Sequence, residues 1–243
     1  MDHRPFGTPK IMPVYQLPTS PVFPDPSEAE GDGLLAVGGD LSPVRLLEAY
    51  SLGIFPWFNE GDPLLWWSPP QRALWLPGDF RPSANLRRNL RRSAYEIRID
   101  SAFEAVMGGC ALAPRSGQPG TWISGDFVKA YTELHHQGYA HSFEAWQDGA
   151  LVGGLYGVSL GAAFFGESMF SIAPNASKAA FAALCETVFG WGFHFIDGQL
   201  ENPHLLRLGA RMVARGEYLA RLREAMEEGT RLGSWSQSAT PES

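Results

Sequence analysis

Three apolar runs between residues 141 and 170 limit the possible folds more than any other stretch of this sequence. Residues 141–147 and 150–158 flank Asp148-Gly149, a dipeptide typical of a two-residue hairpin turn. Ser159-Leu160-Gly161 then turns the chain into a third predicted strand, residues 162–170. The periodicity and turn signals beyond this meander predict helix 174–190, strand 193–197, helix 203–208, strand 211–215 and helix 216–228. We therefore predict an α+β fold with a mixed, mostly antiparallel sheet.

The chain before the meander is richer in proline and aromatic residues. Residues 1–32 are predicted to be extended and irregular, and Ser42-Pro43 is expected to start a helix over residues 43–52. The aromatic residues between 54 and 67 follow neither helical nor strand periodicity, which is typical of a compact aromatic core or of a platform for a flat ligand. We expect most of the rings to form a core and at least one, Trp57, to face a cleft. Further on we expect strands 73–76 and 95–100, and helices up to residue 92, at 101–112 and at 125–137.

Two predicted strands each carry a carboxylate among apolar residues. Glu167 lies within an aromatic stretch, and Asp197 follows Phe195 and Ile196. If residues 195–199 are extended, Asp197 and Gln199 share a face, because side chains alternate along a strand. Either carboxylate alone is most simply a strand-end residue bonded to nearby backbone. The pair, with an amide beside it, instead favours a site that orients and deprotonates an amine.

One predicted helix carries clustered arginines. Leu86 and Leu90 are four residues apart and form its apolar stripe, and no acidic residue lies between Asp79 and Glu96. The guanidinium groups share one side of the helix, at Arg87, Arg88, Arg91 and Arg92. A solvated helix face and a contact with phosphate backbone explain this cluster about equally well.

Composition excludes several classes of protein. The 243 residues carry a net charge of −7, so any contact with nucleic acid must come from a local patch. Cys110 and Cys185 are the only cysteines, which argues against a disulfide framework and suits a reducing compartment. Neither a metal-binding motif nor an apolar run long enough to span a bilayer occurs, and residues 1–5 lack a signal-peptide core. We expect a cytoplasmic protein without a metal and without membrane partners.

A set of ordered motifs extends this interpretation, and the succession of meander, helix, strand, helix and strand is that of the GNAT acyltransferase fold. In chain order, the motifs are GLLAVGGDLSP at 33–43, GIFPWF at 53–58, WWSP at 66–69, GTWI at 120–123, GESMFS at 166–171, NASK at 175–178 and IDGQ at 196–199. Together they resemble leucyl/phenylalanyl-tRNA–protein transferases. The resemblance runs from about residue 15 to residue 220 and implies a small N-terminal domain at 1–70 followed by a GNAT-like catalytic domain at 71–232. Residues 233–243 are polar and are predicted to be a disordered tail.

The resemblance also implies an activity and a set of site residues. That family moves Leu, Phe or Met from aminoacyl-tRNA to proteins with an N-terminal Arg or Lys, marking them for degradation, and uses no coenzyme A. By motif, the family's catalytic positions are taken by Glu167, Asp197 and Gln199. The positions that hold the terminal adenosine are taken by Trp57 and Trp122. The helical arginines at 87, 88, 91 and 92 fall in the region that contacts tRNA in the family. The amino-acid pocket is implied at Leu155, Phe164, Met169, Phe181, Leu184 and Ile196. No cofactor is expected, since an aminoacyl ester is already activated and needs positioning and a deprotonated amine.

Two other functions compete with this one. A GNAT enzyme that uses acyl-CoA needs a glycine-rich loop opening a helix, and residues 171–178 lack that pattern. A non-catalytic tRNA-binding module explains the arginines and tryptophans but leaves the two carboxylates and the amide without a role.

Overall fold

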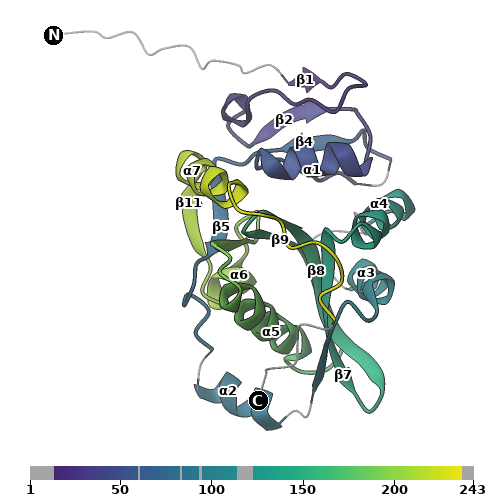
Figure 1. Cartoon of the computed structure of the whole chain (residues 1–243), viewed down its shortest axis with the longest axis vertical. Helices are drawn as coiled ribbons and strands as arrows, with labels where there is room; N and C mark the ends of the chain where they lie inside the picture. The colour runs from purple at the N-terminus through teal and green to yellow at the C-terminus, as the bar shows by residue number, and fades with distance from the viewer. Residues whose placement is uncertain (1–13, 60, 83, 93–94, 114–122, 237–243) are drawn as a thin grey trace, which may run out of the picture.

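The computed structural model describes residues 14–59, 61–82, 84–92, 95–113 and 123–236. Its strands form two sheets, a small one near the N-terminus and a large one that makes up the body of the molecule (Figure 1). None of the described helices is both long enough and apolar enough to cross a bilayer. The α+β class with mixed, mostly antiparallel sheets is confirmed.

The large sheet has the strand order β11-β5-β10-β9-β8-β7-β6. Every neighbouring pair is antiparallel except β10 and β9, which run parallel. The predicted meander is β7, β8 and β9, and the Asp148-Gly149 turn joins β7 to β8. The strand bounds are β5 Gln71–Trp75, β6 Glu96–Ile99, β7 Ala140–Gln147, β8 Ala150–Leu160, β9 Ala163–Ser171, β10 Phe195–Asp197 and β11 Arg211–Ala214.

Helices cover both faces of this sheet. The helix α5 packs on one face, whereas α3 and α4 pack on the other, together with α1 and α7. The seven α-helices of the described residues are α1 Pro43–Ser51, α2 Ala84–Arg92, α3 Phe103–Leu112, α4 Gly125–His136, α5 Ala176–Gly190, α6 Pro203–Arg207 and α7 Arg215–Met226. Their positions agree with the sequence predictions to within about two residues at most ends, because the starts carry Ser-Pro, Asn-Pro or Ser caps.

The two faces bury two apolar clusters. Adjacent residues of β9 point to opposite faces, so Phe165 joins the cluster under α3 and α4 while Phe164 joins the cluster under α5. The first cluster continues into the small sheet, where Trp66 is fully buried. The small sheet and the large sheet therefore share one apolar core, and a domain division at residue 70 stays a prediction.

The small sheet is a feature that the sequence interpretation missed. Its strands are very short, and its order is β1-β2-β4-β3. The bounds are β1 Tyr15–Gln16, β2 Leu34–Val37, β3 Phe55–Pro56 and β4 Leu65–Trp67. Strands of two to four residues are too short to show a period of two, so the segments were predicted to be irregular. The predicted aromatic core is present, since Trp66 and Phe55 are buried and the indole of Trp66 donates to the carbonyl of Gly38 at 2.9 Å.

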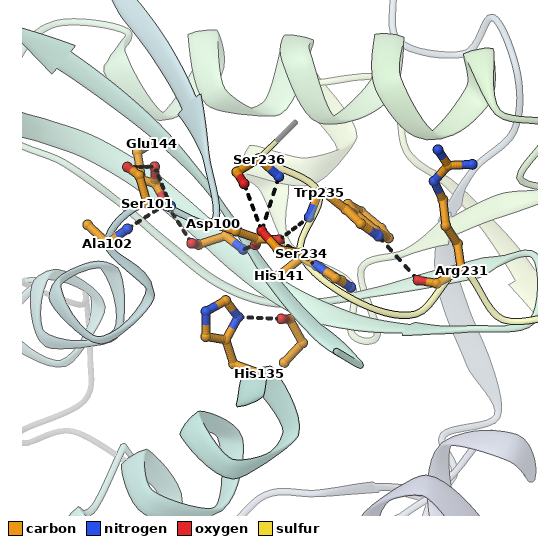
Figure 2. A network of polar contacts seen from close by, with 12 residues as sticks. Asp100, Ser101, Ala102, His135, His141, Glu144, Arg231, Ser234, Trp235 and Ser236 are labelled. Carbon is orange, nitrogen blue, oxygen red and sulfur yellow. Dashed lines mark hydrogen bonds and ion pairs between the residues drawn. The ribbon is translucent and has the colours of Figure 1, made fainter. Parts of the chain in front are cut away.

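The sequence prediction places the start of the disordered tail too early, at residue 233. Residues 233–236 are described, and Trp235 is only 1% exposed. Figure 2 shows its indole over His141, with ring centroids 3.6 Å apart, while its amide donates to Asp100 Oδ2 at 2.8 Å. The same carboxylate accepts from His141 Nδ1 at 2.9 Å and from the amide of Ser142 at 3.0 Å. Trp235 thus ties this segment to β7 and to Asp100, the residue that follows β6. Residues 237–243 lie outside the described part of the chain.

Candidate active site

The two carboxylates predicted from the sequence lie where β9 and β10 part. The parallel ladder between these strands joins Ala163–Phe165 to Phe195–Asp197, after which β9 continues to Ser171 while the chain leaving β10 stays with β5. On its other side β9 pairs with β8, where Gly166 faces Gly157 and Ser168 faces Tyr156. Glu167 is therefore the extra residue of a β-bulge, a distortion that re-aims a side chain and is frequent beside active sites.

The carboxylate of Glu167 is held by three donors from distant parts of the chain. Tyr50, in α1, donates to Oε1 at 2.7 Å, and the side-chain amide of Gln199 donates to the same oxygen at 2.7 Å. Tyr131, in α4, approaches Oε2 at 3.4 Å, and the hydroxyl groups of the two tyrosines are hydrogen-bonded to each other. The helix α1, from the N-terminal part of the chain, thus contributes to the surroundings of a residue on the large sheet.

This environment raises the pKa of Glu167 from its ordinary value of 4.5 to about 7. Burial is the largest cause, and the negative charge of Asp197 raises the pKa further, while the hydrogen bonds from Tyr50, Gln199 and Tyr131 oppose the change. The residue as a whole is partly buried. Glu167 is a carboxylate whose proton affinity suits exchange near neutral pH.

Asp197 occupies a different environment. It is fully buried, and both of its oxygens bond to the guanidinium group of Arg72, a residue of β5. The hydroxyl group of Tyr218, in α7, donates to Oδ2 at 2.9 Å, and the backbone amide of Gln199 donates to Oδ1 at 2.7 Å. Arg72 also donates to the carbonyl of Gly53 at 3.1 Å. Asp197 is saturated with donors and closed off from solvent.

The predicted common face of Asp197 and Gln199 is not present. That prediction required an extended backbone to residue 199, but β10 ends at Asp197 and Gln199 has a left-handed backbone with φ of 62°. The chain can turn here only with glycine at position 198, because a Cβ added to Gly198 would lie 2.8 Å from the ring of Trp75. The two side chains are linked through the backbone instead: Asp197 accepts from the amide of Gln199, whose side chain then reaches Glu167.

Four residues of this site were not found by sequence reasoning: Tyr50, Arg72, Tyr131 and Tyr218. Arg72 carried a usable signal in the sequence, because a charged residue directly precedes the apolar run Ala73-Leu74-Trp75; in the structure it is only 1% exposed. The three tyrosines carried none, since a tyrosine on the buried side of a helix is ordinary core material.

The six residues of the predicted amino-acid pocket converge on the α5 face of the sheet. Five are buried members of one apolar cluster and Met169 packs against it, partly exposed. Phe181 contacts Trp75, with ring centroids 4.7 Å apart, and Phe80, at 5.1 Å. The structure brings Leu155, Phe164, Met169, Phe181, Leu184 and Ile196 together. Their role in holding an amino acid stays a prediction.

The structure describes only some of the predicted nucleic-acid contacts. Trp57 is partly exposed and packs against Trp67, with ring centroids 5.7 Å apart. Trp122 lies outside the described residues. All four arginines of α2 are exposed, and the helix lies at the end of the molecule opposite the small sheet (Figure 1). The geometry is compatible with a solvated helix face and with a contact to phosphates.

The described residues contain no group of three or more His, Cys, Asp or Glu side chains placed to hold a metal ion. Cys110 and Cys185 are buried free thiols, and burial raises the pKa of Cys185 far above its ordinary value. A thiol of this kind remains protonated near neutral pH and is a poor nucleophile.

Comparison with known proteins identifies a family over most of the chain. The family model for leucyl/phenylalanyl-tRNA protein transferase matches residues 74–223, and the model for the N-terminal domain of the same family matches residues 39–70. Leucyl/phenylalanyl-tRNA–protein transferases from Anaeromyxobacter sp. (strain K) and Myxococcus xanthus (strain DK1622) are 55% and 51% identical over 224 and 230 residues. These alignments cover 92% and 94% of this chain and 96% and 98% of the relatives.

Another relative, from Desulfatibacillum aliphaticivorans, is 53% identical over 93% of this chain and 97% of its own length. Among solved structures, L-PGS from Bacillus licheniformis covers 69% of this chain and 53% of its own, with a TM-score of 0.36 and 13% identity, a likeness too weak to interpret. The sequence relatives and the two family models agree, so the chain belongs to the leucyl/phenylalanyl-tRNA protein transferase family.

Proposed function

We propose that this protein transfers Leu, Phe or Met from aminoacyl-tRNA to the α-amino group of proteins that begin with Arg or Lys, marking them for degradation. Membership of the family makes the chain an aminoacyltransferase. The single observation that carries the proposed chemistry is the position of Glu167, whose carboxylate accepts hydrogen bonds from Tyr50 and Gln199 at 2.7 Å in an environment that raises its pKa to about 7. Because its donor substrate is made where translation occurs, we place the reaction in the cytoplasm.

The reaction needs a base near neutral pH. An α-amino group has an unperturbed pKa of about 7.7–8.0 and is mostly protonated at pH 7, so it must lose a proton to attack the ester carbonyl. A carboxylate with a pKa near 7 is substantially deprotonated at this pH and still basic enough to accept that proton. Glu167 therefore acts as the general base in this proposal. The ester C–O bond breaks as the amide bond forms, and the tRNA 3′-oxygen leaves as a hydroxyl group that takes up the proton accepted by Glu167.

Gln199 orients the attacking amine. Its Nε2 is engaged by Glu167 and its backbone amide by Asp197, so the side chain is held at both ends. Its side-chain carbonyl oxygen is then positioned to accept a hydrogen bond from the amine, which is the role that an amide can play without changing protonation.

Asp197 supports this arrangement without contacting the substrate. Its burial and its ion pair with Arg72 favour a positioning role over proton collection, because protonating Asp197 would leave the buried guanidinium uncompensated. Its negative charge also raises the pKa of Glu167. In the proposal, Asp197 fixes Gln199 and tunes Glu167, and it does not touch the substrate.

The two substrates meet beside Glu167 in this proposal. The apolar cluster under α5 would hold the side chain of the donor's amino acid, and its lack of polar groups suits Leu, Phe and Met. Trp57 and Trp122 would stack on the terminal adenosine, and the arginines of α2 would contact the tRNA backbone. The acceptor's amine would enter on the face that carries Tyr50, Tyr131 and Glu167.

The experiment that tests the proposal measures transfer of labelled leucine or phenylalanine from charged tRNA to a peptide that begins with Arg. A peptide of the same sequence with an acetylated N-terminus is the control acceptor, and Glu104→Gln, at an exposed position in α3, is the control variant for Glu167→Gln. We expect transfer to the free Arg peptide only, unchanged in Glu104→Gln and about 100-fold slower in Glu167→Gln. Equal rates in the two variants would refute the role of Glu167, and no transfer by the wild-type protein would refute the function.

A further inference from the structure

A basic groove lies between three helices, outside the candidate active site. It holds about 290 Å³ and is lined by the segment that leads into α2, the start of α5 and the helix α6. Its ionisable lining residues are all basic: Arg81, Lys178, His204 and Arg207. The remaining described residues that line the groove are neutral, and none of the described lining residues carries a carboxylate.

Among the described residues, no carboxylate forms an ion pair with any of these four basic side chains. Lys178 Nζ donates to the amide oxygen of Asn175 at 3.1 Å, and Arg81 Nε donates to the carbonyl of Gly78 at 2.9 Å, so both cations are bonded to neutral oxygens. Burial, and then the charges of Lys178 and Arg207, lower the pKa of His204. The protein carries a net charge of −7, so a groove lined by positive charges stands out and is suited to bind an anion.

The position of the groove indicates which anion. The helix α2 carries the exposed arginines beyond Asn85 and Leu86, which themselves line the groove. On the other side, His204 is five residues from Gln199, a separation of at most about 18 Å even in an extended chain. Figure 1 shows α5 and α6 between α2 and the body of the large sheet. The groove therefore lies between the arginine helix and the residues of the candidate active site.

We propose that this groove binds the phosphodiester backbone of the donor tRNA next to its aminoacylated 3′ end. This inference rests on the proposed function, which supplies the tRNA. A strand that reaches from the arginine helix to Gln199 has to pass phosphates through the intervening surface. The protein acceptor does not fit the groove, because its N-terminal Arg or Lys would be repelled by Lys178 and Arg207.

Donors of increasing length test the inference. Aminoacyl-adenosine has no phosphodiester, an aminoacylated trinucleotide ending in the same adenosine has only those next to the reacting end, and charged tRNA has all of them. The test variant is Lys178→Gln with Arg207→Gln, and the matched control is Arg221→Gln with Arg223→Gln, which removes the same charge from the exposed side of α7. All are assayed as the full chain with a peptide that begins with Arg.

We expect the wild-type protein and the α7 control to use the trinucleotide with a higher kcat/KM than aminoacyl-adenosine. The groove variant should lose roughly tenfold of this preference while its kcat/KM with aminoacyl-adenosine stays unchanged, since contacts of charged groups with phosphate are strong. Its salt dependence with the trinucleotide should weaken by about 0.7 in the logarithmic slope for each phosphate contact removed.

Three outcomes would overturn the inference. The first is a groove variant with the same preference for the trinucleotide as the α7 control. The second is a defect that appears equally with aminoacyl-adenosine, which would show a disturbed active site. The third is a raised KM for the peptide with unchanged donor kinetics, which would assign the groove to the acceptor. In each case transfer by the wild-type protein still decides the proposed function separately.

Discussion

Replacing Glu167 by glutamine removes a charge from the site and keeps the size and shape of the side chain. The variant is expected to be more stable than the wild-type protein at alkaline pH and much less active. Glutamine can still accept a hydrogen bond from Tyr50 or Gln199 through its one oxygen, and its amide can donate to the hydroxyl of Tyr131. The main change is therefore the loss of a carboxylate whose charged form is destabilised by burial in the folded protein.

The size of the effect follows from the pKa of Glu167. The folded protein raises it from 4.5 to about 7, so the folded state binds the proton more tightly than the unfolded state. The stability contribution is fully present below the unfolded value and is lost as the pH rises through the folded value. At roughly 1.4 kcal/mol per pKa unit, the loss is about 3 kcal/mol above pH 7. Glutamine does not titrate and avoids this loss.

Urea unfolding of the wild-type protein and of Glu167→Gln between pH 5 and pH 9 measures the difference. We expect the free energies of unfolding to be similar near pH 5, to diverge up to about pH 7 and to differ by up to about 3 kcal/mol beyond it, with Glu104→Gln following the wild-type curve. A difference that does not change with pH would refute the reasoning, because it would mean that hydrogen bonding, and not the cost of the charge, decides stability at this position.

Three other predictions address separate parts of the molecule. Trp57→Ala should raise the KM for aminoacyl-adenosine by the equivalent of about 1–3 kcal/mol, measured beside the urea midpoint, since loss of stability alone would make Trp57 a core residue. Replacing the four arginines of α2 by glutamine should reduce the salt slope of tRNA binding by about 0.7–0.9 per lost contact and spare transfer from aminoacyl-adenosine. The lowered pKa of His141, caused by burial and opposed by Asp100, means that its contribution to stability is lost as the pH falls below about 6.5. His141→Gln in the Glu167→Gln background should flatten this decline in urea unfolding between pH 7 and pH 5.

The sequence alone could locate the two carboxylates but not their surroundings. Glu167 is conspicuous because a charge among Phe and Met demands an explanation. Its partners Tyr50 and Tyr131 lie 117 and 36 residues away in the chain, and Arg72 lies 125 residues from Asp197. No periodicity connects residues at such distances, since they meet only when α1, α4 and β5 are assembled on the sheet.

Errors in the sequence interpretation have local causes that can be named. Asp197-Gly198 is a turn dipeptide, and reading it as such would have ended the strand at Asp197. The strands of the small sheet, such as Tyr15–Gln16, are too short for their alternation to be recognised. The segment around Trp235 has the polar composition of a tail, but one tryptophan stacked on His141 is enough to fix it. The meander and the helices were predictable because they are long and strongly patterned.

The role of Asp197 allows a sharper test than its removal. In Asp197→Asn the charge of Arg72 would be left buried without a partner, which costs about 3–5 kcal/mol, so lost activity would not distinguish chemistry from unfolding. Changing Arg72 to methionine in the same protein removes the second charge, and replacing both members of a buried ion pair is often close to neutral. We therefore expect the urea midpoint of the double variant to lie much nearer to that of the wild-type protein.

The double variant separates positioning from proton transfer. Asparagine at position 197 keeps one oxygen that can accept from the amide of Gln199, as Oδ1 of Asp197 does at 2.7 Å. Its Nδ2 takes the place of Oδ2 and can donate to the hydroxyl oxygen of Tyr218, but asparagine cannot collect a proton. If Asp197 positions Gln199, the double variant should retain most of its transfer rate, and its pH profile should change little, because the lost charges of Asp197 and Arg72 act on the pKa of Glu167 in opposite directions. A folded double variant that has lost transfer at every pH would assign the proton to Asp197, and Glu167 would then no longer be the base.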